Sequence, residues 1–386
     1  MYKSCKVRLY PTKEQRESIW RHIGACRFIW NYMLHLQQEN FKSGDKLISA
    51  SKMTILLPEM KKTETYSWMN NISAASLQRE CSNLQYAYEQ FFKKNAGYPK
   101  FKTKKKSRPA YPVAYQPFRF EENYVTVAKL GKVKYKSDFN FLQNPETKYS
   151  NMQIEYENEK YFLSFSYACE TQVRELTDKP MGIDVGIKTL ATAAFSDKQI
   201  SYPNINKSKK MKKLEEKAKR LQRSISRKYE ISRKGTTDYV KTNNIRKEET
   251  KLRKTLVRMT NIRRNYIHQT THELIEKLPC VVTMETLDVS RMLKNKHIRK
   301  DIGETSMKKF LNTMKYKCEE NGIQFVQVDR YYPSSKTCSN CGTIKPNLKL
   351  SDRVYICPDC GLKIDRDFNA AINLMMYGAH QKEFRL

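Results

Sequence analysis

The chain has 386 residues, of which 73 are Lys or Arg and 40 are Asp or Glu, giving a formal net charge of +33 and an isoelectric point near 9.7. A positive excess of this size opposes compaction by self-repulsion unless a polyanion neutralises it, which favours a nucleic-acid partner. No run of about 18 apolar residues exists, which excludes a transmembrane helix, and the segment MYKSCKVRLY lacks the apolar core of a signal peptide. We therefore expect an intracellular protein of two to four domains, whose ten cysteines are thiols or metal ligands.

The N-terminal residues predict a strand followed by a helix. Residues 5–10 alternate polar and apolar side chains, as a short strand does. Thr12 and Gln15 then match the two ends of a capping box, which marks the start of a helix. Apolar residues follow at helical spacing as far as Met33, so a first helix is expected here.

A second helix is expected from about Ser73, with one apolar face that reaches Phe91. The stretch between the two helices includes Pro58 and is interpreted as irregular. The segment 93–112 is rich in Lys and interrupted by Gly and Pro. We interpret this segment as a loop or linker that grips a nucleic-acid backbone, and not as a packed element.

The middle of the chain changes to strand character and then to long basic helices. Residues 113–170 predict a small antiparallel barrel or sheet, which the first short strand can join, leaving the helical region as an insertion. Residues 181–195 predict two strands with a turn near Gly186. Residues 205–278 predict basic helices, interpreted as a hairpin that contacts phosphates; a merely solvated hairpin is the alternative.

The most specific motif is a pair of Cys-x2-Cys sequences, separated by fifteen residues and each followed by glycine. Its members are Cys338, Cys341, Gly342, Cys357, Cys360 and Gly361. Four thiolates in two tight turns suit a closed tetrahedral zinc site, which stabilises a fragment too small to have its own core. We expect one structural Zn²⁺ here. The six other cysteines stand singly and are interpreted as small buried hydrophobic residues.

Three carboxylates stand in contexts where a charge is unexpected. Asp184 interrupts the apolar strand of GIDVG. Glu285 follows the apolar strand of residues 280–284, and Asp367 begins an expected helix at DFNAAINL. Burying a carboxylate is costly unless it is paired or binds a metal. The alternatives are that Asp184 caps a turn, that Glu285 marks a strand end and that Asp367 is an ordinary helix N-cap.

Taken together, these acids predict a magnesium site. Carboxylate oxygens are the ligands that Mg²⁺ prefers. A pair of such ions about 3.5–4 Å apart can activate a water and stabilise the leaving oxygen when a phosphodiester is cleaved. The order of an acid on a strand (Asp184), an acid on a later strand (Glu285) and an acid on a helix (Asp367) is compatible with the RNase H fold.

The chain resembles TnpB, also called OrfB, a transposon-encoded nuclease family related to compact type V CRISPR effectors. The matching stretches are KVRLYPTKEQ (6–15), SLQRECSNLQYAYEQFF (76–92), GYPKFKTK (97–104), GIDVGIKTLA (182–191), METL (284–287), YYPSSKTCSNCG (331–342) and CPDCGLKIDRDFNAAINL (357–374). Singly the N-terminal stretches are common, whereas the ordered set with a cysteine ribbon directly before DRDFNAA is specific.

The resemblance implies an α+β multi-domain fold with a β-barrel wedge domain (1–10 and 111–176) and a helical recognition lobe with a basic linker (11–110). It further implies a RuvC-type, RNase H-like nuclease domain (177–330 and 362–386) and an inserted zinc-ribbon domain that binds the target nucleic acid (331–361). The metal-binding acids of the family map to Asp184, Glu285 and Asp367. Gln78 maps to a position that reads a short motif beside the DNA target, although an ordinary exposed helical Gln is the alternative. Arg330 is a candidate phosphate contact.

The expected function is RNA-guided cleavage of DNA beside a short flanking motif, by Mg²⁺-dependent phosphodiester hydrolysis in a protein encoded by a mobile element. The expected cofactors are two Mg²⁺, one Zn²⁺ and a guide RNA; the expected partners are that RNA and double-stranded target DNA, with no membrane. We expect a monomer with one RNA in the prokaryotic cytoplasm, associated with the nucleoid. The alternatives are a nuclease-inactive RNA-guided repressor, a transposase and a guide-free junction resolvase.

Overall fold

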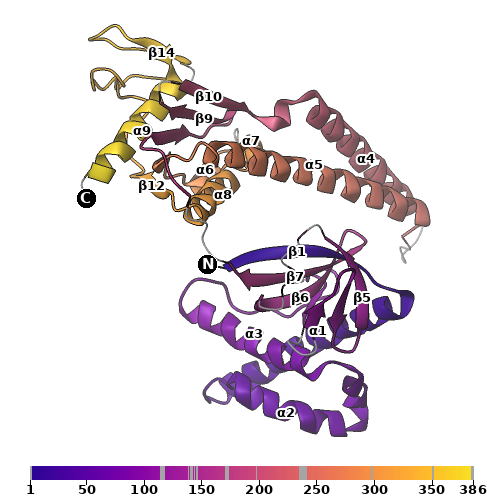
Figure 1. Ribbon diagram of the computed structural model, residues 1–386. Helices are drawn as coiled ribbons and strands as arrows, with labels where there is room; N and C mark the ends of the chain where they lie inside the picture. Colours follow the sequence, from indigo (N-terminus) through magenta and orange to yellow (C-terminus); the bar gives the residue numbers. More distant parts are fainter. Residues whose placement is uncertain are drawn as a thin grey trace. The chain divides into compact units, whose positions relative to one another are not determined.

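The computed structural model describes residues 2–113, 118–137, 139, 142, 144, 147–169, 174–196, 198–233, 241–296, 299–349 and 352–383. The chain divides into two compact units, Met1–Glu170 and Thr171–Leu386, here called the N-terminal and C-terminal units (Figure 1). In the parts of the chain that are described, no helix combines the length and the apolar character needed to span a bilayer.

The N-terminal unit is built on a seven-stranded antiparallel sheet with the order β2-β6-β7-β1-β5-β4-β3. Its strands are β1 (Tyr2–Tyr10), β2 (Ala110–Pro112), β3 (Phe118–Phe120), β4 (Tyr124–Val127), β5 (Gly131–Lys136), β6 (Tyr149–Glu157) and β7 (Lys160–Ala168). β1 lies inside the sheet, because it pairs with β7 on one side and with β5 on the other. The expectation that the first strand joins this sheet is therefore confirmed, and the helices after it are inserted between two of its strands.

The inserted helices are α1 (Lys13–Lys42), α2 (Ala50–Lys62), the 3₁₀ helix η1 (Glu64–Asn71) and α3 (Ala74–Phe92). The predicted capping box is confirmed: the Gln15 backbone N–H donates to the Thr12 hydroxyl at 3.3 Å, and the Thr12 N–H donates to the Gln15 side chain at 3.0 Å. The prediction of an irregular stretch around Pro58 is wrong, because Pro58 lies inside α2. Met53, Leu57 and Met60 form one buried face of this helix, which offsets the backbone hydrogen bond that proline cannot make.

The Lys-rich segment 93–112 is more closely packed than the sequence indicated. The Trp30 indole N–H donates to the Lys100 carbonyl at 3.0 Å, and the Asn31 amide both donates to and accepts from the Lys102 backbone. The Lys102 ammonium lies 3.8 Å from the Trp30 ring centroid and pairs with the buried carboxylate of Glu80. The interpretation of this segment as unpacked is therefore wrong where it crosses α1 and α3.

The C-terminal unit is built on a five-stranded sheet with the order β10-β9-β8-β11-β12. The strands are β8 (Pro180–Asp184), β9 (Thr189–Phe195), β10 (Lys198–Pro203), β11 (Val281–Glu285) and β12 (Gln324–Val328). β8, β9 and β10 are antiparallel neighbours, whereas β8, β11 and β12 run parallel. The two strands predicted within residues 181–195 are confirmed as β8 and β9.

Helices cover both faces of this sheet. The helices of this unit are α4 (Lys209–Arg233), α5 (Asn243–Ile275), α6 (Val289–Met292), α7 (Arg299–Thr305), α8 (Met307–Glu320) and α9 (Arg366–Glu383), with the short 3₁₀ helix η3 (Ile205–Lys207) before α4. Of these, α5, α8 and α9 pack on the sheet. α4 and α5 pack side by side, as the predicted basic hairpin requires (Figure 1). Ile183 and Met284 share a core with Phe310 of α8 and with the end of α5, so α5 and α8 cover one face. α9 packs against β8, β9 and β11.

The position of α9 depends on two glycines, which let the helix and the strands approach each other closely. A Cβ at Gly182 of β8 would lie 2.0 Å from the Ala371 carbonyl oxygen of α9, and a Cβ at Gly378 of α9 would lie 2.0 Å from the Thr283 hydroxyl of β11. Because side chains alternate along a strand, residues 182 and 283 point away from the core that contains Ile183 and Met284. α9 therefore covers the opposite face of the sheet from α5 and α8.

Candidate functional site

Two of the predicted acids stand at matching positions on neighbouring parallel strands. Ile183 of β8 pairs with Met284 of β11, and the next residue on each strand is Asp184 and Glu285 respectively. Because Ile183 and Met284 point into the core under α5 and α8, alternation directs both acids to the face covered by α9. The carboxyl ends of β8 and β11 thus bring two half-buried acids side by side.

The third acid reaches the same edge from α9. The helix contacts Gly182 of β8 through Ala371, and it contacts Thr283, which pairs with Gly182 on β11, through Gly378. α9 therefore passes from β8 to β11, and the carboxylate in its first turn acts electrostatically on Asp184. Asp367 is in that first turn.

Asp367 is not the N-cap of its helix. Asp365 precedes the first residue of α9 and accepts a hydrogen bond from the backbone N–H of Phe368 at 3.0 Å, which is the contact an N-cap makes. The Asp367 carboxylate instead accepts from the Arg366 guanidinium at 3.0 Å and lies 4.0 Å from the Arg353 guanidinium. The N-cap alternative for Asp367 is thereby wrong.

The three acids act on one another electrostatically. Burial raises the pKa of Asp184 well above its usual range, and the carboxylates of Glu285 and Asp367 raise it further. The Arg366 guanidinium acts in the opposite direction, as does the Val185 backbone N–H that contacts the Asp184 carboxylate. Negative charge is thus concentrated at this edge of the sheet, which is the condition that a bound cation relieves.

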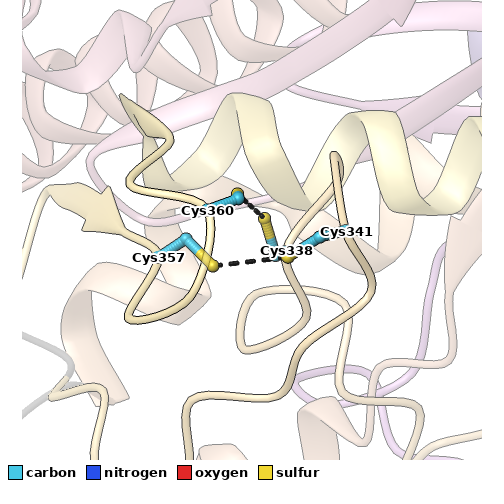
Figure 2. A group of neighbouring side chains, drawn as sticks. All are labelled: Cys338, Cys341, Cys357 and Cys360. Atoms are coloured by element: carbon cyan, nitrogen blue, oxygen red, sulfur yellow. Dashed lines mark hydrogen bonds between the residues drawn. The ribbon is translucent and has the colours of Figure 1, made fainter.

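The four predicted cysteines converge at a second centre, before α9. Within the described residues, they form the one group of three or more His, Cys, Asp or Glu side chains whose ligand atoms all lie within 4.8 Å of one another. The oxygens of the three carboxylates are therefore spread more widely than the four sulfurs. Cys338 and Cys360 have their sulfurs 3.6 Å apart, and Cys341 and Cys357 have theirs 3.5 Å apart (Figure 2). A tetrahedral site with Zn–S bonds of about 2.3 Å separates its sulfurs by about 3.8 Å. The four thiols therefore fit a zinc ion.

Local backbone structure forms the two cysteine turns. Gly342 and Gly361, which follow the two pairs, have φ values of +79° and +72°, a conformation that favours glycine. The hairpin of β13 (Val354–Ile356) and β14 (Lys363–Asp365) holds the second pair. The Thr343 side chain and backbone lower the pKa of Cys341 to about 6, which favours the thiolate that binds metal. Tyr355 is fully buried against Cys338 and Cys357, in a core too small to hold this segment by itself.

The remaining six cysteines differ in how deeply they are buried. Cys26, Cys81, Cys280 and Cys318 are buried, in agreement with their interpretation as small hydrophobic residues. The prediction is only partly right for the other two, because Cys5 and Cys169 are half-buried.

Gln78 and Arg330 belong to different units of the chain. Gln78 is exposed on α3 and lines a groove of about 540 Å³ together with Arg79 and Asn151, whose side chains share a 3.1 Å hydrogen bond. Arg330 follows β12, and its guanidinium lies 3.2 Å from the Asp288 carboxylate. Both residues line open grooves, as a nucleic-acid contact would.

Sequence reasoning missed one residue that contacts an acid and two asparagines of α9 that contact the segment around that residue. Ser334 donates a hydrogen bond to the Glu285 carboxylate, although the two residues are far apart in sequence. Asn369 and Asn373 are buried on α9 at 0% and 4% exposure. Their spacing of one helical turn inside the apolar run FNAAINL was a visible signal, because buried amides on one helix face need partners.

Three family models match separate parts of the chain. The OrfB model described as a probable transposase matches residues 153–296, a helix-turn-helix domain model matches residues 1–46, and a Cas12f1-like TNB domain model matches residues 308–374. The residues matched by the helix-turn-helix model fold as β1 and the single long helix α1. The TNB match contains all four clustered cysteines and Asp367.

Relatives match the chain over nearly its whole length. A putative RNA-guided DNA endonuclease from Streptomyces pristinaespiralis is 29% identical over 97% of this chain and 88% of its own length. The putative RNA-guided DNA endonuclease InsQ from Escherichia coli (strain K12) is 28% identical over 97% of this chain and 91% of its own. The solved Cas12f1-sgRNA-target DNA complex contains a chain of similar fold, with a TM-score of 0.60 at 14% identity, covering 97% of this chain and 98% of that one. The three family models and these relatives support the TnpB (OrfB) family for this chain.

Proposed function

We propose that the protein is an RNA-guided DNA endonuclease encoded by a mobile element, and that Asp184, Glu285 and Asp367 hold the divalent ions for phosphodiester hydrolysis. The observation that carries this proposal is that Asp184 and Glu285 end neighbouring parallel strands and that the carboxylates of Glu285 and Asp367 both act on Asp184. The relatives named as putative RNA-guided DNA endonucleases support the same activity.

The sheet topology supports a RuvC-type, RNase H-like assignment for this domain. Three antiparallel strands in sequence order, β10-β9-β8, continue into the parallel strands β11 and β12. This arrangement puts the ends of β8 and β11 side by side, which is where a nuclease of that fold needs its first two acids. The proposed domain limits remain 177–330 and 362–386 for the nuclease, 331–361 for the zinc ribbon, 1–10 and 111–176 for the wedge, and 11–110 for the recognition lobe.

The acids suit Mg²⁺ because they offer only oxygen donors and because their mutual repulsion is relieved by a cation. When bound, a pair of magnesium ions would supply Lewis-acid stabilisation of charge on the attacking and leaving oxygens. Asp184, whose pKa both other acids raise, would hold the ions together with Glu285 and Asp367. Arg366 and Arg353 neutralise Asp367 and are placed to attract a phosphate toward it.

The remaining surface fits a guide RNA and a DNA target. The net charge of +33 and the basic hairpin of α4 and α5 supply phosphate contacts. In this proposal, pairing with the guide selects the target, Gln78 contributes to recognition of a short flanking motif from its groove, and Arg330 contacts a phosphate. The cysteine cluster holds one structural Zn²⁺. The protein would act as a monomer with one RNA, on nucleoid DNA in the prokaryotic cytoplasm.

Two measurements on the full chain test the proposal. RNA that co-purifies with the protein should be one uniform species with a variable or element-derived 3′ end, and random cellular RNA would count against a guide. The complex should cut a plasmid that carries the matching target when Mg²⁺ is present. Asp184→Ala should abolish cutting and leave RNA binding intact, and cutting that persists in this variant would remove Asp184 from the mechanism.

A transposase is the second candidate, because the matched OrfB family model is described as a probable transposase. The same acids suit strand transfer, since that reaction also displaces an oxygen at phosphorus. Sequencing of reaction products separates the two functions. Cleaved ends alone support the endonuclease, whereas joined element–target DNA would support the transposase.

A further inference from the structure

Glu285 has its hydrogen-bond partner in the segment that leads into the cysteine turns. The Ser334 hydroxyl donates to Oε1 of Glu285, and Ser334 is 2% exposed. In the described part of the chain, this is the one hydrogen bond that the Glu285 carboxylate makes, and it leaves Oε2 available to a cation. A buried hydroxyl that occupies one carboxylate oxygen restricts the rotation of that carboxylate.

The segment 334–339 is in turn fixed to α9 by two buried amides. The Asn373 side-chain NH₂ donates to the Ser334 and Thr337 carbonyls, both at 2.7 Å. The Asn369 NH₂ donates to the Thr337 carbonyl at 2.7 Å, and its carbonyl oxygen accepts from the Ser339 backbone N–H at 3.0 Å. Because these amides are buried, breaking one contact leaves a polar group unpaired, which holds the segment in one position.

The same elements carry the other parts of both centres. Asp367 is on α9 shortly before Asn369 and Asn373, and Cys338 lies within the segment that the two amides hold. Displacement of segment 334–339 would therefore move the partner of Glu285 and strain the contacts of α9. We propose that Ser334 is a positioning residue for Glu285, and that segment 334–339 with Asn369 and Asn373 forms a brace through which the folded cysteine ribbon sets the geometry of the acids. This inference rests on the proposed function in that the acids bind divalent ions.

A purely structural tie would have different consequences. It would lower the stability of the fold when Ser334 is truncated, without a selective effect on ion binding. A positioning residue changes the affinity of the ligand that it orients, and loss of such a partner costs about 10- to 100-fold in metal affinity.

The test uses the full chain, with Mn²⁺ as the probe and the electron paramagnetic resonance signal of free Mn²⁺ as the readout. Loss of binding in Asp184→Ala identifies the acidic site. Ser334→Ala should weaken Mn²⁺ binding at that site by about 10- to 100-fold. The matched control Ser335→Ala, which alters the neighbouring half-buried serine, should leave the affinity and the unfolding midpoint unchanged.

Two further variants test the brace itself. Asn373→Ala, which removes the amide that holds the Ser334 carbonyl, and Cys360→Ser, which disrupts the ribbon, should both weaken Mn²⁺ binding in the same direction. Wild-type affinity in Ser334→Ala, or in both of the other variants, would overturn the proposal. A wild-type chain that binds Mn²⁺ with these sensitivities but never cuts DNA would contradict the endonuclease proposal and leave the brace supported. A wild-type chain with no Asp184-dependent Mn²⁺ binding would overturn both.

Discussion

Gly182→Ala is the most direct test of how the acidic site is assembled, because it adds one methyl group between β8 and α9. The new Cβ would lie 2.0 Å from the Ala371 carbonyl oxygen, 2.3 Å from the Met375 backbone nitrogen and 2.9 Å from the Met375 Cα. All three are backbone atoms, so no side-chain rotation relieves the overlap. α9 as a whole has to move away from the sheet.

The size of the effect follows from these distances. Ordinary van der Waals separation begins at 3.4 Å, so the carbonyl at 2.0 Å has to retreat by about 1.4 Å. Overpacking of a closely packed interior costs about 1–3 kcal/mol, and we expect the upper end because the clash is with backbone. Asp367 moves with α9, and a misplacement of about 1 Å at a catalytic site costs about 100-fold in rate. Gly182→Ala should therefore lose about 3 kcal/mol of unfolding free energy and about 100-fold in the rate of DNA cleavage.

Gly303→Ala is the matched control, because a Cβ at this position in α7 meets no atom within 4 Å. Alanine in a helix is more stable than glycine by about 0.5–1 kcal/mol, so this variant should gain stability and cleave DNA at the wild-type rate. Urea unfolding and plasmid cleavage at saturating Mg²⁺ measure the two quantities. The reasoning is refuted if Gly182→Ala unfolds within about 0.5 kcal/mol of the wild type and cuts DNA equally fast.

Three further outcomes are expected. Cys360→Ser, or treatment with a zinc chelator, should release one zinc per chain by elemental analysis and expose residues 331–361 to protease; a zinc-free wild type would contradict this. Burial lowers the pKa of His22 below its ordinary value of 6.5, so the unfolded chain takes up a proton at higher pH than the folded chain does. The stability measured in urea should therefore fall as the pH drops below about 6.5, and His22→Gln should weaken this pH dependence. The double variant Lys213→Gln with Lys217→Gln neutralises two exposed positions on α4. It should reduce the slope of log RNA affinity against log salt concentration by about 0.7–0.9 for each phosphate that these lysines neutralise in the wild type. An unchanged slope would exclude both lysines from phosphate binding.

The parts of the fold that depend on local pattern were predictable from the sequence. The capping box at Thr12, the strands that end in Asp184 and Glu285, and the cysteine pairs each follow from a spacing that has one structural solution. The order of the strands in the C-terminal sheet was predictable only through resemblance, because nothing local specifies that β11 pairs with β8 over about a hundred intervening residues.

The errors have physical causes that local reasoning cannot include. Pro58 breaks helices on propensity alone, but the buried face that contains Met53 and Leu57 stabilises α2 around it. The Lys-rich segment was interpreted as solvated, whereas Lys102 pairs with Glu80 on α3 and lies over the Trp30 ring. In both cases an interaction distant in sequence outweighs a local preference, and such interactions become visible only when the chain is folded.

The start of α9 assigns helix capping and metal binding to two different acids, because a single carboxylate cannot perform both tasks together. A carboxylate that caps a helix accepts hydrogen bonds from backbone N–H groups. Those hydrogen bonds lower the affinity of the carboxylate for any other ligand. In Asp365-Arg366-Asp367, the first acid takes the capping position over Phe368, and the arginine between them pairs with the second acid. Asp367 is thereby left in the first helical turn, where its charge is favoured by the helix dipole, and its carboxylate is free of the capping role. Exchanging these two roles would require only a shift of the helix start by two residues, and the hydrogen bonds of Asn369 with Thr337 and Ser339 oppose that shift. The register of α9, fixed by its buried amides and by the approach to Gly182, therefore decides which of the two acids acts on Asp184.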